Sequence, residues 1–171
     1  MLKSKLLKPT ILSLSFLSVL SGAAISPALG KIQQAFPNAD PLLIQMTLTL
    51  TPLFIIPFSL LSGRISLKFR KRHILFVGLT IYFLAGVGGG LMNNMTTLLV
   101  TRALLGVGTG LVSALSLSLI ADFYQGEERS STMGLSSAFA TLGGIILTLA
   151  SGWLALLSWR YAFAAYGVSF F

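Results

Sequence analysis

Residues 96–121 read TTLLVTRALLGVGTGLVSALSLSLIA, and Arg102 is the only ionisable side chain in this run. A helix rises about 1.5 Å per residue, so a helix of this length crosses the ~30 Å hydrocarbon core of a bilayer. The rest of the chain is similar, because 54% of its 171 residues are hydrophobic and only 9% are charged. A soluble domain carries roughly 25% charged residues. The sequence indicates an integral membrane protein, and the absence of cysteine excludes a disulfide scaffold and a zinc-thiolate site.

Five more apolar runs flank this stretch and together predict an all-α membrane protein with six spans. The first run follows three lysines and imitates a signal peptide, but the later runs favour a retained first span. The sixth run is only about 16 Å long as a helix, too short to cross a bilayer. We therefore expect the sequence to be the N-terminal part of a longer protein. To within a few residues, the expected spans are 10–32, 42–62, 73–92, 96–121, 133–157 and the incomplete 161–171.

The basic residues gather at alternate ends of these spans. The net charge is +8, which in a soluble protein would suggest nucleic acid as a partner. Nine of the twelve Lys and Arg residues precede the first span or follow the second and fourth spans, whereas only Lys31 and Arg160 lie in the other connections. The positive-inside rule explains this pattern without nucleic acid. We expect a multi-pass protein of the cell membrane, surrounded by membrane lipids, with a cytoplasmic N-terminus.

The connection after the second span carries a motif. Residues 63–73 read GRISLKFRKRH and resemble the loop signature of the major facilitator superfamily, Gly-x-Leu-Ala-Asp-Arg-x-Gly-Arg-Lys/Arg. Leu67 replaces the family's Asp and Arg70 replaces its second Gly. In the family that Asp pairs at the interface between two halves, so its contact is lost here. An ordinary basic loop is the alternative for this segment alone. The matching positions are Gly63, Ile65, Lys68, Lys71 and Arg72.

The fourth span carries a second motif, which resembles the family's Leu-x-x-x-Arg-x-x-Gln-Gly-x-Gly. An Arg inside a span costs about 2.5–3.5 kcal/mol, so Arg102 should face a polar partner or a wet cavity. Snorkelling to the outer surface is the alternative. Leu105 replaces the family's Gln. The matching positions are Leu98, Arg102, Gly106 and Gly108.

Small residues and a proline shape the spans. Gly86 and Gly90 form one pair four residues apart, and Gly106 and Gly110 form another. Such pairs let helices approach closely, so packing explains them better than a gating role. Pro27 should kink the first span.

A third resemblance is spread over the second half of the chain. Residues 121–124, 127–129, 133–134 and 159–163 follow the order and spacing of the superfamily's drug/proton antiporters. Leu147 and Thr148 occupy the slots of the antiporters' Gly-Pro pair, so this subclass is favoured rather than established. The resemblance implies a six-helix N-terminal half made of two inverted three-helix repeats.

The same resemblance implies alternating-access transport of a small molecule, with drug efflux favoured. Uptake within the superfamily and a truncated, non-transporting membrane protein remain alternatives. The implied partners are a small-molecule substrate and the missing C-terminal half or a second copy; coupling to protons stays open, because no carboxylate lies within the spans. No metal cluster, nucleophile-base pair or phosphate loop suggests an enzyme or a cofactor.

The candidate site residues follow from the motifs and from the family's use of the first and fourth spans to line a cavity. We expect Lys71 to pair with Asp122, at the inner end of the fourth span, when a cytoplasmic gate closes. Candidates for transport or gating are Gly63, Lys68, Lys71, Arg72, Arg102, Gly106, Gly108 and Asp122. Candidates for lining the cavity are Ser18, Ser21, Ser26, Thr109 and Ser113.

Overall fold

The computed structural model describes residues 2–23, 25–164 and 166. These residues form helices and short connections and contain no strand, which confirms the all-α prediction. Within them, five segments are long and apolar enough to cross a membrane. The elements in chain order are α1 (Leu2–Ala23), the 3-10 helix η1 (Ser26–Ala28), α2 (Leu29–Ala35), α3 (Pro41–Ile65), α4 (Lys71–Gly89), α5 (Met95–Phe123), α6 (Gly126–Leu157) and α7 (Trp159–Ala164).

The first expected span, 10–32, is interrupted. Helix α1 ends at Ala23, and Pro27 lies in η1 before α2 begins at Leu29. Proline lacks a backbone N–H and clashes with the preceding turn, so it cannot continue a regular helix. The predicted kink is thus a break between two helices.

Polar residues fix the starts of two spans. The Asp40 carboxylate accepts a 2.9 Å hydrogen bond from the Leu42 N–H, and Pro41 occupies the first turn of α3. The Asn94 side chain accepts a 3.0 Å bond from the Thr96 N–H at the start of α5. These caps satisfy N–H groups that have no partner within the helix.

The polar stretch after the fourth span is mostly helical, whereas the sequence suggested a connection up to the expected fifth span at residue 133. Gly126 adopts a positive φ of 54° and begins α6. Glu127 and Glu128 occupy the first turn of that helix, where negative charge is favoured by the helix dipole. The sixth expected span is described only through α7 and Tyr166; its other positions lie outside the described residues.

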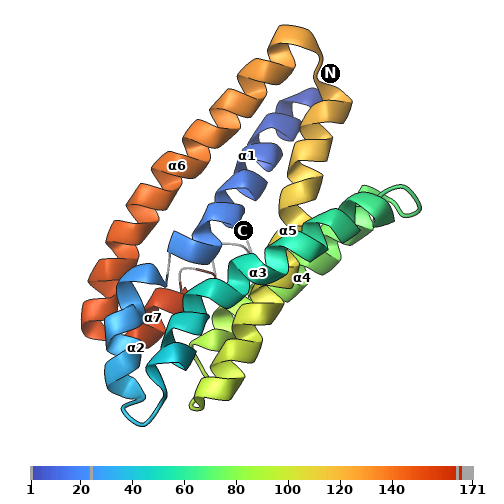
Figure 1. Ribbon diagram of the computed structural model, residues 1–171. Coiled ribbons are helices and arrows are strands. Elements are labelled where there is room, and N and C mark those ends of the chain that lie inside the picture. The colour runs from blue at the N-terminus through green and yellow to red at the C-terminus, as the bar shows by residue number, and fades with distance from the viewer. Residues whose placement is uncertain (1, 24, 165, 167–171) are drawn as a thin grey trace.

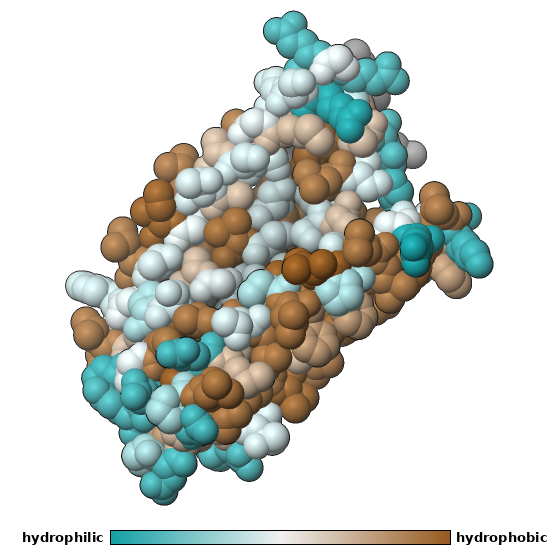
Figure 2. Space-filling view, viewed as in Figure 1, coloured by the Kyte–Doolittle hydropathy of each residue, from teal (hydrophilic) through white to brown (hydrophobic). Residues whose placement is uncertain are grey.

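The helices alternate in direction, so their connections gather at two ends of the bundle. The N-terminus and the α3–α4 and α5–α6 connections lie toward one end, and the α2–α3, α4–α5 and α6–α7 connections lie toward the other (Figure 1). Hydrophobic residues cover much of the surface between these ends (Figure 2). Helix α5 is the most buried span, with 56% of its most apolar window inside the structure.

Glycines set the close packing of α5. A Cβ on Gly106 would lie 2.8 Å from Phe54 Cβ and closer still to the Thr51 carbonyl oxygen, and one on Gly110 would lie 2.8 Å from the Ile55 carbonyl oxygen. Gly108 instead approaches α4, where its Cβ would lie 2.7 Å from the Tyr82 nitrogen. Alternate glycines therefore pack α5 against α3 and α4, as expected for small residues in membrane bundles.

Candidate functional site

An ion pair joins α4 to α5 at the end that carries the α3–α4 connection. Lys71, the first residue of α4, donates from its Nζ to Asp122 Oδ2 and also to Ser118 Oγ at 2.5 Å. The Lys71 side chain is 26% exposed and that of Asp122 is 48% exposed. An ion pair with this exposure contributes about 0–1 kcal/mol to stability, so its position matters more than its strength. The structure brings together the two residues that the sequence paired.

The other candidates of the α3–α4 connection do not join this pair. Gly63, in the last turn of α3, is exposed and faces open space. Lys68 is exposed in the turn, and the Arg72 guanidinium lies over the Phe76 ring, 5.5 Å from its centroid. Leu67 is 87% exposed, so it does not replace the contact that the family's Asp makes.

Arg102 is fully buried, with 0% exposure. Its guanidinium lies 4.3 Å from the centroid of the Phe163 ring and 5.4 Å from that of Tyr166. Its Nη1 donates a 3.1 Å hydrogen bond to Tyr166 Oη. Within the described part of the chain, its Nε and Nη2 have no hydrogen-bond partner. Arg102 thus has the polar partner that was expected, without reaching the surface of this chain.

Two tyrosines connect this arginine to α1. Tyr166 Oη donates to the Ser21 carbonyl at 3.0 Å, and Tyr82 Oη donates to the Leu17 carbonyl at 2.9 Å. The two tyrosine rings meet edge to face, 5.8 Å apart. On α4, Gly86 makes room for Tyr166, because a Cβ there would lie 2.6 Å from that residue's Cβ. The arrangement links α1, α4, α5 and the segment after α6 around one buried charge.

The five cavity candidates do not converge through their hydroxyl groups. Ser26 is exposed at the start of η1, whereas Thr109 and Ser21 are buried. The hydroxyls of the four candidates other than Ser26 donate to carbonyls of their own helices: Ser18 to Leu14, Ser21 to Ser18, Thr109 to Leu105 and Ser113 to Gly110. Their role in lining a cavity stays a prediction.

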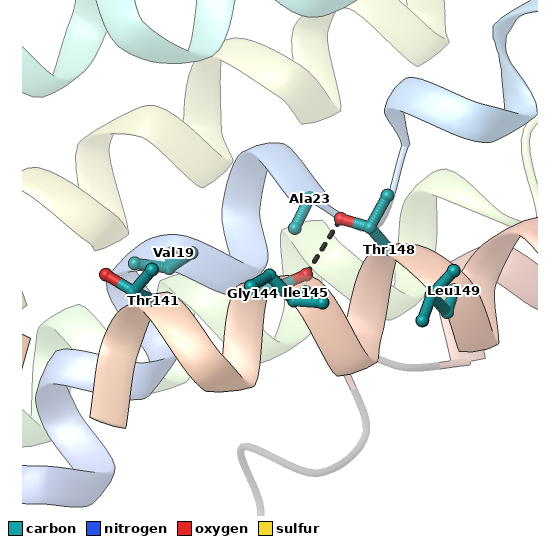
Figure 3. Close-up of a pocket in the computed structure, with 7 residues that line it drawn as sticks. All are labelled: Val19, Ala23, Thr141, Gly144, Ile145, Thr148 and Leu149. Carbon is teal, nitrogen blue, oxygen red and sulfur yellow. Dashed lines mark hydrogen bonds between the residues drawn. The ribbon is translucent and has the colours of Figure 1, made fainter. Parts of the chain in front are cut away.

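A pocket of about 480 Å³ opens between α1 and α6 and contains none of those candidates. Pockets for small molecules span roughly 300–1,000 Å³ and are mostly apolar. Figure 3 shows Thr141 and Thr148 of α6 on the side of Val19 and Ala23 of α1, with Thr148 Oγ1 donating to the Gly144 carbonyl at 2.8 Å. The 3–4 residue spacing on α6 is a signal that could have identified this face. The lining residues are Val19, Ala23, Thr141, Gly144, Ile145, Thr148 and Leu149.

Three serines form a further polar contact between helices, which the motifs did not indicate. Ser15 Oγ of α1 lies 2.5 Å from Ser136 Oγ of α6 and 3.1 Å from Ser116 Oγ of α5. Hydroxyls between membrane helices commonly bond across the interface. None of the three serines belongs to a motif in its own span, so no pattern in the sequence indicated that they meet.

Comparisons with known proteins agree with the fold and the motifs. The family model of the Major Facilitator Superfamily matches residues 11–171. The multidrug transporter protein MdtP of Bacillus subtilis (strain 168) is 27% identical over 163 residues, which are 94% of this chain and 30% of that protein. The puromycin resistance protein pur8 of Streptomyces alboniger is 32% identical over 153 residues, which are 88% of this chain and 30% of that protein.

A solved structure has the same fold. The inward open conformation of the xylose transporter XylE from E. coli superimposes with a TM-score of 0.68 at 19% sequence identity, over 93% of this chain and 45% of that one. The chain spans 30% of the length of the two curated relatives above. It belongs to the Major Facilitator Superfamily, a family of multi-pass membrane transporters and not of enzymes, and has the fold of part of the N-terminal half.

Proposed function

We propose that the chain is the N-terminal half of a secondary transporter that exports a small molecule across the cell membrane by alternating access. Its membership of the superfamily supports transport. Efflux is supported by two relatives whose names refer to multidrug transport and to puromycin resistance. The pocket between α1 and α6 is shallow and open, and its mostly apolar lining would favour a lipophilic substrate.

We place the N-terminus and the α3–α4 connection in the cytoplasm. These lie toward one end of the bundle with the start of α6 (Figure 1), and nine of the twelve Lys and Arg residues belong to these segments. Cytoplasmic connections hold the excess of Lys and Arg in membrane proteins.

The observation that carries the proposal is the contact of Lys71 with Asp122 at this end. In alternating access, one end of the bundle must open while the other closes. An exposed ion pair suits such a step, because it contributes little to the stability of either state and can be broken repeatedly. With Leu67 in place of an acid, Asp122 supplies the carboxylate that holds Lys71 in the closed gate.

A second six-helix unit completes the transporter in this proposal, supplied by the rest of a longer chain or by a second copy. The match covers 45% of the xylose transporter, which leaves a second half of similar size. Helices α3 and α6 are the least buried spans, with 17% and 28% of their most apolar windows inside the structure. Lipid and the second unit cover these faces.

Asp122→Asn is expected to slow export by about 5–150-fold, the usual range when two coupled sites are disconnected. The amide keeps the size of the side chain but removes the charge that holds Lys71. Stability should change by less than about 1 kcal/mol. The measurement is puromycin accumulation in cells that express the complete transporter. Glu127→Gln is the control, because it removes an exposed acid from the first turn of α6. If puromycin accumulation with Asp122→Asn equals that with the natural transporter, the Lys71–Asp122 pair is not part of a gate.

The same assay separates the alternatives. Relative to cells that do not express the transporter, export lowers puromycin accumulation, uptake raises it, and a non-transporting protein leaves it unchanged. A protonophore abolishes export if protons are coupled. Since all four acids of the chain lie near helix ends, a coupling carboxylate would then belong to the second unit. The acids are Asp40, Asp122, Glu127 and Glu128.

A further inference from the structure

The connection between α3 and α4 forms a basic turn, which we define as residues 64–72. It contains five cations and no acid. Only one of the five, Lys71, has a carboxylate partner within the described part of the chain. The other four are exposed: Arg64, Lys68, Arg70 and Arg72.

Two large apolar side chains are exposed in the same turn. Leu67 is 87% exposed and Phe69 is 63% exposed, and they flank Lys68. Hydrophilic and hydrophobic residues lie side by side where the α3–α4 connection leaves the bundle (Figure 2). Segments that mix cations with leucine and aromatic side chains are typical of the boundary between headgroups and acyl chains.

The position of the turn sets what it can contact. It joins two spans, α3 and α4, so it lies at the depth where lipid headgroups begin. No side chain caps the start of α4, and the N-terminus of a helix favours negative charge, although the His73 N–H in this turn already donates to the Arg70 carbonyl at 3.0 Å. The turn differs from the superfamily signature at the two positions that matter here: Leu67 replaces an acid and Arg70 replaces a glycine.

We propose that the basic turn binds the phosphate headgroup of an anionic phospholipid, with Leu67 and Phe69 inserted between the headgroups and the acyl chains. The four cations without a carboxylate partner contribute the charge selectivity, and the two apolar side chains favour a lipid over free phosphate. The proposal needs only that the chain spans a membrane, so it stands independently of the transport activity.

The association of lipids with the chain tests the charge. The 171-residue chain is reconstituted in phosphatidylcholine vesicles, and trace spin-labelled phosphatidylglycerol is compared with trace spin-labelled phosphatidylcholine. A basic residue near an anionic surface changes binding about fivefold. Leu67→Asp places an acid among the cations and is expected to lower the selectivity for phosphatidylglycerol about fivefold. Leu67→Asn introduces a side chain of the same size as aspartate but without the charge, and it should keep the selectivity for phosphatidylglycerol. No selectivity in the natural chain, or equal losses in both variants, overturns the proposal.

Inorganic phosphate separates the two sources of the anion. Millimolar phosphate should leave the selectivity for phosphatidylglycerol largely in place, because it cannot use the two apolar contacts. Saturable binding of inorganic phosphate to the chain in phosphatidylcholine vesicles, lost in Leu67→Asp and kept in Leu67→Asn, would assign the turn to free phosphate instead.

The absence of cysteine allows a direct test of insertion. A spin label on Leu67→Cys should collide readily with oxygen and poorly with a water-soluble nickel complex in vesicles that contain phosphatidylglycerol. The same label on Glu127→Cys, in the exposed first turn of α6, should show the opposite preference. Equal access of the nickel complex to both labels rules out insertion of the turn.

Discussion

Gly106→Ala is expected to lower the free energy of unfolding of this chain by about 3 kcal/mol, the upper end of the range for overpacked cores. The new Cβ would lie 2.8 Å from Phe54 Cβ and closer to the Thr51 carbonyl oxygen. The backbone of α3 cannot rotate out of the way as a flexible side chain could, so α3 and α5 must separate. Separation also weakens the 3.2 Å bond from Thr51 Oγ1 to the Arg102 carbonyl.

The measurement is the thermal midpoint of the chain in one detergent, followed by circular dichroism. A loss of 1 kcal/mol shifts the midpoint by about 2–4 °C in a chain of this size. Gly134→Ala is the matched control, because a Cβ there meets nothing within 4 Å. Alanine favours a helix over glycine by about 0.8–1 kcal/mol, so the control midpoint should stay or rise. Similar midpoints for the two variants would contradict close packing of α3 on α5.

The sequence predicted the helical class well because apolar length is a local property. Residues 42–62 and 96–121 were expected as spans, and the helices found are Pro41–Ile65 and Met95–Phe123. The prediction of helix boundaries was weaker where a polar segment nevertheless forms a helix. Glu127 and Glu128 suggested a connection, yet they lie in a helical turn because acids are favourable at a helix start.

The candidate site was predictable only where a motif pairs residues directly. Lys71 and Asp122 come from two motifs of one family and meet in the structure. Ser118 also contacts Lys71, and its position one turn before Asp122 is a spacing that the sequence displays. The contact of Arg102 with Tyr166 spans 64 residues, so it depends on packing after α6 and no local pattern indicates it.

Arg102 tests whether a buried charge is retained for stability or for activity. Arg102→Met is expected to stabilise the chain by about 1–4 kcal/mol, by analogy with buried ion pairs that are replaced by apolar side chains of similar volume. Methionine fits the same space and makes favourable contacts with the Phe163 ring. It also removes a charge whose Nε and Nη2 have no partner in the described residues.

The conservative control should change stability in the opposite direction. Arg102→Lys keeps the charge but loses the planar group stacked 4.3 Å from the Phe163 centroid and the bond to Tyr166 Oη. A desolvated cation–π contact is worth about 2 kcal/mol, so the midpoint of Arg102→Lys should fall below that of the natural chain. If Arg102→Met also falls, the contacts of the guanidinium outweigh its desolvation and Arg102 holds the bundle together. If it rises, as we expect, the arginine persists at a cost to stability, which would support a role for Arg102 in the activity that we propose.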